Sequence, residues 1–194
     1  MNFASMMTYI GVMSITPGPN NLMSLYLGAK GGFRKSFRFI SSSMVCLFIK
    51  TMLCGLLNVL LAETIPAVVP YLKWVGAAYM LYLAFTMVRS GIKSAEDQES
   101  SGEGTIRSAI LLQLLNIKSW IAALSIFSVY VIPYTTAFSA IFFASFAFFL
   151  LAGIASILWC CCGVAIQKLF RKYRLPVSIV LALSLVYCAY TAIR

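Results

Sequence analysis

Long apolar runs, separated by short polar or charged segments, extend along almost the whole sequence. A helix that crosses a membrane needs about 20 mostly apolar residues. We therefore predict an all-α integral membrane protein with six transmembrane helices, at approximately 5–27, 39–62, 66–90, 107–131, 137–165 and 175–193. Each half of the chain then contains three spans. Because three is an odd number, any relation between the halves is a 3+3 inverted repeat.

The composition places the whole chain in the membrane class. Hydrophobic residues make up 61% of the sequence and charged residues 10%, against about 25% charged residues in soluble domains. We expect one transmembrane domain over 1–194, with halves at approximately 1–93 and 105–194 joined by a polar cytoplasmic loop over 94–104. The first basic residue is Lys30, so the opening segment lacks the positive region of a secretory signal and is expected to remain as the first span.

Charged and aromatic residues near the predicted span ends indicate an orientation. Basic residues concentrate in the first, third and fifth loops, whereas the second and fourth loops are nearly free of them. Because basic loops stay cytoplasmic, both termini are predicted on the periplasmic side. The net charge of +10 fits anchoring to an anionic lipid bilayer rather than binding of nucleic acid. We interpret the aromatic residues near span ends as interfacial anchors: Tyr71, Trp74, Tyr130, Tyr134 and Trp159.

Cysteine and histidine usage argues against metal, cofactor and enzyme chemistry. The sequence has no histidine, and thus lacks the commonest metal ligand and general base. Its six cysteines lie within apolar runs, without the paired spacing of a zinc site. We interpret them as small hydrophobic residues in helix interfaces: Cys46, Cys54, Cys160, Cys161, Cys162 and Cys188.

The segment Thr16-Pro17-Gly18-Pro19-Asn20-Asn21 interrupts the first predicted span. Pro17 precedes Lys30 by 13 residues, or about 20 Å of helix, so the interruption lies near the bilayer midplane. The two prolines free the carbonyls of Met13 and Ile15. The segment is either a kink or a true break, tolerated where it is packed or lines a wet cavity. In a true break the second half begins near Asn20, where N–H groups attract an anion and the freed carbonyls a cation.

The fourth predicted span carries polar residues at a similar depth. Lys118 lies 11 residues past Arg107, about 16 Å into the membrane, with Gln113 and Asn116 close by. This span occupies the position in the second half that the interrupted span occupies in the first. Matching irregular features in two halves point to the binding site of a transporter. The alternative is a lysine that extends to the membrane surface.

A second deep lysine, Lys50, lies 12 residues past Arg38, about 18 Å into the second span. No acidic residue lies inside any span except Glu63 at an outer end. The two deep lysines are therefore deprotonated, hydrated or paired with a mobile anion such as a substrate carboxylate. Whether Lys50 has a functional role stays open.

Several motifs resemble the lysine-exporter (LysE/RhtB) family of amino-acid exporters, over the whole chain. They are Pro17-Gly18-Pro19-Asn20, Gly28, Gly31-Gly32-Phe33-Arg34, Trp74-Val75-Gly76-Ala77-Ala78-Tyr79 and Asn116-x-Lys118. Pro19-Asn20-Asn21, Gln113 with Asn116, and the segments 179–183 and 185–189 look most like the cysteine/O-acetylserine exporters. The family often has proline where Ile117 stands, which predicts a less broken fourth helix here. It usually has glycines near Ser42 and Cys46, and a hydrophobic residue near Lys50.

The resemblance implies a secondary transporter of the bacterial inner membrane. It would export cysteine, O-acetylserine or similar small amino acids by alternating access, driven by the membrane potential or a proton gradient. The residues predicted to bind substrate are Pro17, Gly18, Pro19, Asn20, Asn21, Lys50, Gln113, Asn116 and Lys118. Whether the chain forms a homodimer is left open.

The alternative from another class is a membrane thiol–disulfide relay. Such a relay needs two cysteines brought within bonding distance of each other. We expect no cysteine beside Pro17-Gly18-Pro19 or Asn116, where a central reaction site would lie.

Overall fold

The computed structural model describes residues 2–92 and 104–193, and within them all regular structure is helical. The predicted all-α class is therefore confirmed for this part of the chain. The predicted polar loop lies, up to residue 103, outside the described residues. In chain order the elements are α1 (Phe3–Ile15), α2 (Pro19–Leu56), α3 (Asn58–Ile92), α4 (Ile106–Leu115), α5 (Ile117–Ser125), the π-helical η2 (Ile126–Val131), α6 (Phe138–Ala165), α7 (Gln167–Lys172) and α8 (Arg174–Ile193).

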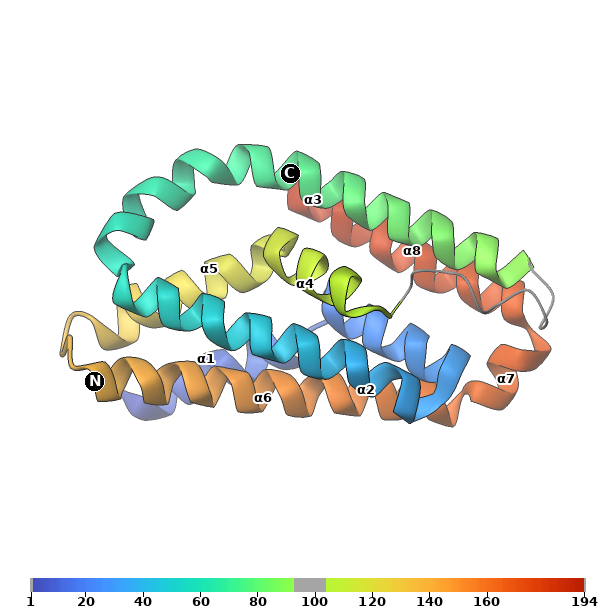
Figure 1. Cartoon of the computed structure of the whole chain (residues 1–194), viewed down its shortest axis with the longest axis horizontal. Coiled ribbons are helices and arrows are strands. Elements are labelled where there is room, and N and C mark those ends of the chain that lie inside the picture. Colours follow the sequence, from blue (N-terminus) through green and yellow to red (C-terminus); the bar gives the residue numbers. More distant parts are fainter. Residues whose placement is uncertain (1, 93–103, 194) are drawn as a thin grey trace.

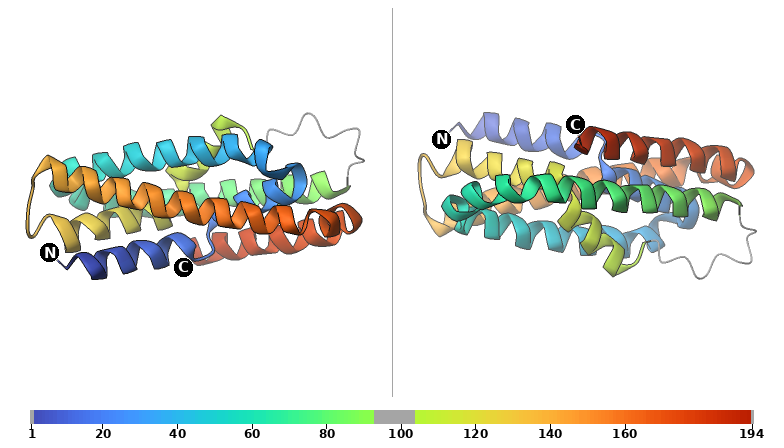
Figure 2. Two further views of the ribbon diagram at one scale, coloured as in Figure 1. Left: turned by 90° about the horizontal axis from the view of Figure 1, so that it is seen from below. Right: turned by 90° about the horizontal axis from the view of Figure 1, so that it is seen from above.

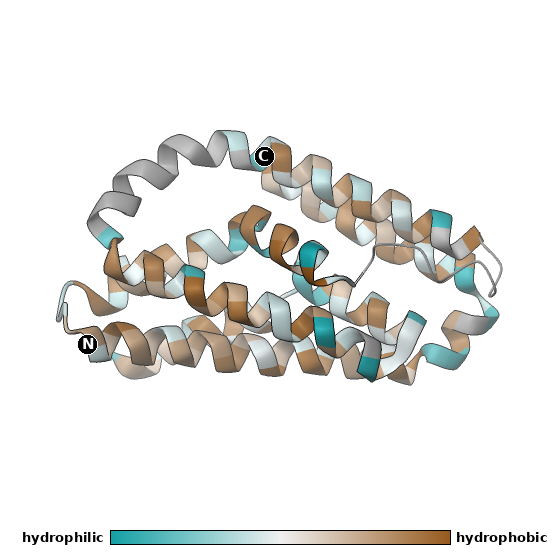
Figure 3. Cartoon of the chain, viewed as in Figure 1, coloured by the Kyte–Doolittle hydropathy of each residue, from teal (hydrophilic) through white to brown (hydrophobic). Residues whose placement is uncertain are grey.

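Three of the described helical segments are long and apolar enough to cross a membrane: Ser36–Leu56 of α2, α6 and α8. The run from α4 through η2 makes a fourth candidate if it is one span bent by 59°. Helix α1 is apolar but has only 13 residues. Apolar residues cover most of α6 and the second part of α2, while hydrophilic residues gather around α7 and the turn within α2 (Figure 3). The number of crossings remains a prediction.

The helices run roughly along the long axis of the molecule and pair across the two predicted halves (Figures 1 and 2). The most extensive helix–helix contacts join α2 to α6 and α3 to α8. Helix α1 packs along α6, and the short helices α4 and α5 each contact both α2 and α3. The helices predicted as the second spans of the two halves thus contact each other, as do those predicted as the third spans.

Two of the predicted loops are shorter than the sequence indicated. Gly32, with φ of 76°, makes a turn inside α2 where a loop was predicted, and glycine adopts this conformation without steric cost. The second span ends at Leu56 rather than near 62, and α3 begins at Asn58. Residue 63 therefore belongs to α3 and not to a loop. The hydropathy pattern could not separate these turns from helix because their residues are compatible with both.

Glycines bring the first part of α2 against α6. A Cβ atom at Gly28 would collide with the carbonyl oxygen of Cys160, and one at Gly163 with that of Leu25. Small residues let helix backbones approach closely in membrane proteins. This contact fixes the start of α2, and with it the residues that follow the first helix break.

Candidate functional site at two facing helix breaks

The first break separates α1 from α2. Helix α1 ends at Ile15 and α2 begins at Pro19, one residue before the predicted start. Thr16 has extended backbone angles (φ −60°, ψ 142°), and Gly18 is also extended (φ −163°, ψ 171°). The interruption is therefore a true break between two helices and not a kink in one helix.

Side chains of the protein already donate hydrogen bonds to the carbonyl groups at the end of α1. The indole Nε1 of Trp159 donates a hydrogen bond to the carbonyl oxygen of Ile15 (3.1 Å). The hydroxyl of Thr16 donates to the carbonyl of Met13 (3.2 Å), and Nδ2 of Asn21 donates to the carbonyl of Thr16 (3.1 Å). The carbonyls predicted to attract a cation thus have protein donors. Trp159, which the sequence suggested as an interfacial anchor, thus has a further contact, because its indole caps the break.

Lys118 connects the two breaks. Its ammonium donates hydrogen bonds to the carbonyl oxygen of Thr16 (2.8 Å) and to the Thr16 hydroxyl (2.6 Å). A Cβ atom at Gly18 would lie 3.3 Å from Cδ of Lys118. The lysine therefore packs into the first break.

The second break lies at Asn116, between α4 and α5. Asn116 has extended backbone angles (φ −80°, ψ 94°), and the helices on either side are bent by 59°. The absence of proline at Ile117 was expected to leave this helix less broken, yet α5 starts there as a separate helix. The carbonyls of Gln113 and Leu114 at the end of α4 accept hydrogen bonds from side chains instead of from the backbone.

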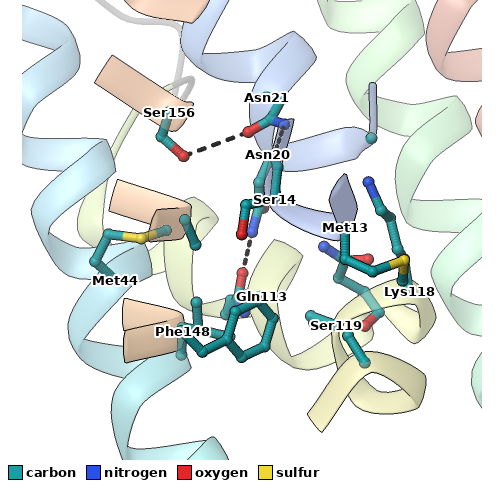
Figure 4. A pocket seen from close by; sticks show the side chains of 15 residues that line it. Met13, Ser14, Asn20, Asn21, Met44, Gln113, Lys118, Ser119, Phe148 and Ser156 are labelled. Atoms are coloured by element: carbon teal, nitrogen blue, oxygen red, sulfur yellow. Dashed lines mark hydrogen bonds between the residues drawn. The ribbon is translucent and has the colours of Figure 1, made fainter. Parts of the chain in front are cut away.

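A small cavity of about 50 Å³, lined by both polar and apolar side chains, lies between the two breaks (Figure 4). Asn20 donates a hydrogen bond to the side-chain oxygen of Gln113 across it, and Ser156 donates to Oδ1 of Asn21 (3.4 Å). Three buried polar atoms on its lining have no partner among the described residues: Oγ of Ser14, Oδ1 of Asn20 and Nε2 of Gln113. Since buried polar atoms are normally paired, these three are available to a ligand or to water.

A larger cavity of about 390 Å³ lies on the other side of Lys118. Met13, Gly18, Asn116 and Lys118 line both cavities and so form the boundary between them. Cys188 lines the larger cavity, which corrects the expectation that no cysteine lies beside the breaks. None of the described residues lining either cavity is acidic, while Lys118 lines both and Lys73 the larger one. The local charge therefore favours an anionic group.

The family model for LysE type translocators matches residues 11–194 of this sequence. The chain belongs to this family. It is 34% identical over 182 residues to cysteine/O-acetylserine efflux proteins from Escherichia coli strain K12, Shigella sonnei strain Ss046 and Shigella flexneri, an alignment that covers 94% of this chain and 92% of each relative. No solved structure matches the sequence.

Membership of this family, together with the apolar helices, makes the chain a multi-pass membrane protein. The family is one of translocators and not a class of enzymes. The alternative of a thiol–disulfide relay gains no support from it, and the six cysteines, all within the described part of the chain, form no disulfide.

Eight of the nine predicted site residues of this translocator line the two cavities. Asn20, Asn21 and Gln113 line only the small cavity, and Pro17 and Pro19 only the larger one. The ninth residue, Lys50, lines neither cavity. It contacts α4 and α5 from its position on α2. Its ammonium donates to the carbonyl oxygen of Gln113 (3.0 Å) and to the hydroxyl of Ser119.

Sequence reasoning missed four residues of this site: Ser14, Ser119, Ser156 and Trp159. Ser14 and Ser156 have apolar neighbours on both sides, and Ser119 directly follows Lys118. From sequence alone, a serine at a helix interface looks the same as one at a binding site. Only the depth of Trp159, six residues before the predicted end of its span, could have marked it.

Proposed function

We propose that this translocator exports cysteine, O-acetylserine or similar small amino acids from the cytoplasm across the bacterial inner membrane. The proposal is supported by the family, by the names of the relatives, and by the site between the two breaks. The observation that carries it is the joining of Lys118 to Thr16, which places one cation and three unpartnered polar atoms around the same small space.

The polar groups of the small cavity suit a zwitterion. Gly18 caps the start of α2 without a side chain, so the first N–H groups of that helix can receive a carboxylate. The ammonium of Lys118 adds the positive charge. Oδ1 of Asn20 is an unpartnered acceptor for a substrate ammonium, and Nε2 of Gln113 an unpartnered donor. A small polar side chain on the substrate is favoured, because the remaining free group is the hydroxyl of Ser14.

Alternating access of two halves fits the size of the cavities. A cavity of about 50 Å³ has room for water and not for an amino acid, since one water occupies about 30 Å³ of liquid. Substrate binding therefore needs the breaks to separate, and Lys118 to exchange Thr16 for the substrate carboxylate. Rocking of one half against the other would produce this separation.

We further propose six crossings in two inverted halves, with both termini periplasmic. In support, both breaks lie in the first helical run of their half, and the helix contacts pair α2 with α6 and α3 with α8. The turn at Gly32 and helix α7, which carry the basic segments of the first and fifth loops, lie at the same end of the molecule (Figure 1). Under the positive-inside rule this end is cytoplasmic. The larger cavity, beyond Lys118 and close to the end of α8, then faces the periplasm.

Efflux from cells tests this function. Cells that overproduce the protein are loaded with a panel of labelled amino acids, and release is followed with and without an uncoupler. We expect faster release of cysteine or O-acetylserine than from cells without the protein, and we expect the uncoupler to slow it. An unchanged release profile, with the protein confirmed in the membrane, would falsify the exporter function.

A further inference from the structure

The second helix break is held together by side chains that sequence analysis did not connect with it. The carbonyl oxygen of Leu114 accepts a hydrogen bond from Nε1 of Trp120 (2.7 Å), and that of Gln113 accepts one from Nζ of Lys50 (3.0 Å). The same ammonium donates to the hydroxyl of Ser119 in the first turn of α5. Lys50 therefore bonds to both sides of the break, to a carbonyl of α4 and to a hydroxyl of α5.

The first break has the same kind of closure. There the indole of Trp159 and the ammonium of Lys118 donate to the carbonyls of Ile15 and Thr16. Each break is thus capped by one tryptophan and one lysine. The difference is that two prolines remove backbone donors at the first break, whereas no proline stands at the second.

The surroundings of Lys50 indicate a structural task for its charge. Its side chain is 2% exposed and lies on α2, 4.9 Å from the ring centroid of Trp120. A buried ammonium is costly unless hydrogen bonds satisfy it, and here two oxygens and an aromatic ring do so. Because Lys50 lines neither cavity, it does not contact a substrate held between the breaks.

We infer that Lys50 is a positioning residue, which holds the break between α4 and α5 in the shape that a proline would otherwise impose. Through the carbonyl of Gln113 it fixes the residue whose side chain pairs with Asn20 across the small cavity. Through Ser119 it fixes the start of the helix that carries Lys118. The inference rests on the proposed function where transport is the readout.

The backbone at the break gives a direct way to test this role. The extended angles of Asn116 (φ −80°, ψ 94°) lie outside the α region that a following proline disfavours. Ile117 is the first residue of α5, a position where a missing N–H breaks no helical bond. Ile117→Pro should therefore fit the structure and make the break independent of Lys50.

The experiment compares the parent with Lys50→Met, Lys50→Arg, Ile117→Pro and the Lys50→Met/Ile117→Pro double variant. Efflux is measured against internal substrate concentration and normalised to protein in the membrane. The matched control is Thr51→Val, because Thr51 is a buried neighbour whose hydroxyl donates a hydrogen bond within α2, to the carbonyl of Leu47 (2.7 Å). A second readout, the thermal unfolding midpoint of the purified protein in detergent, does not depend on transport.

We expect Lys50→Met to raise the half-saturating concentration about 10-fold, with a smaller change in the maximal rate, because the site loses its geometry. The half-saturating concentration of Lys50→Arg should lie between those of Lys50→Met and the parent, since arginine keeps the charge but has a different length and shape. Thr51→Val should resemble the parent, and Ile117→Pro alone is the reference for the double variant. In the double variant the half-saturating concentration should return to within about threefold of the parent.

Two results would overturn the inference: a half-saturating concentration in Lys50→Met equal to that of the parent, or a defect that Ile117→Pro leaves in place. If the parent itself exports no amino acid, the proposed function fails separately. The unfolding midpoint then tests the positioning role of Lys50 by itself, since it should fall in Lys50→Met and recover in the double variant. A midpoint unchanged by Lys50→Met would again contradict the role.

Discussion

Lys118 of α5 closes the helix break between α1 and α2, because its ammonium donates hydrogen bonds to both the carbonyl oxygen and the hydroxyl of Thr16, at 2.8 and 2.6 Å. The two residues lie 102 positions apart in the sequence. The carbonyl of Thr16 also accepts a hydrogen bond from Nδ2 of Asn21, so it keeps a donor when Lys118 moves away. This arrangement lets the lysine change partners without leaving a buried carbonyl unpaired.

The first prediction concerns the charge of Lys118. Lys118→Met keeps much of the side-chain volume and removes the cation, so transport should fall while folding survives. A lost hydrogen bond to a charged group costs about 1.5–3 kcal/mol, hence a roughly 10- to 150-fold weaker interaction with substrate. Lys118→Arg should retain partial function, because the planar guanidinium keeps the charge but differs in length and hydrogen-bond geometry from the ammonium. The measurement is efflux against internal concentration.

The control for this prediction is Lys172→Met, the same change at an exposed lysine of α7. It should transport like the parent. Equal transport by Lys118→Met and Lys172→Met would show that the deep lysine is not a substrate partner.

The second prediction concerns the space beside Lys118. In Gly18→Ala the new Cβ would lie 3.3 Å from Cδ and 3.4 Å from Nζ of Lys118, so the lysine must shift. We expect the half-saturating concentration to rise about 3- to 10-fold, because small misplacements at a binding site are costly. Gly11→Ala is the matched control, since a Cβ there has no neighbour within 4 Å among the described residues. If both variants behave alike, the contact with Lys118 is unimportant.

The third prediction concerns the pair that crosses the small cavity. Asn20 and Gln113 share a hydrogen bond, and each also has a buried atom without a partner. Asn20→Ala and Gln113→Ala should each weaken transport, and the double variant should be less harmed than the sum of the two. Such non-additivity is expected of residues in contact. A double-mutant cycle on efflux measures it, and strictly additive effects would mean that the pair does not act as a unit.

The fourth prediction concerns the cysteines. A variant with all six replaced should retain most transport, because they are interpreted as packing residues. On that background, a single Cys188 should react with a membrane-impermeant maleimide added outside, since it lines the larger cavity. A single Cys54, which is fully buried, should not. Equal labelling of the two would contradict the proposed opening of that cavity to the periplasm.

The first break could be predicted from sequence because its cause is local. Pro17 and Pro19 lack the N–H groups that a helix needs, whatever surrounds them. The nearness of Lys118 to that break could also be predicted, because the helical rise counted from Arg107 gives the two positions a similar depth. These local rules were enough to place the first break and Lys118 in one region.

The side chains that cap the breaks could not be predicted, because they depend on contacts between helices that are distant in the sequence. Trp159 meets Ile15 only because α6 packs along α1, and Lys50 meets Gln113 only because α2 packs on α4. No spacing rule connects such positions. For the same reason the break at Asn116 was underestimated, since its cause is a lysine on another helix and not a proline in its own sequence.

Efflux from liposomes tests the central claim most directly, because purified protein is then the only transporter present. Liposomes with the parent, Lys118→Met or Lys172→Met are loaded with labelled O-acetylserine or cysteine, and release is followed under an imposed membrane potential. The account predicts rapid release with the parent and with Lys172→Met, and release slower by about 10-fold or more with Lys118→Met. Retention of label by parent liposomes as complete as that of protein-free liposomes would contradict it.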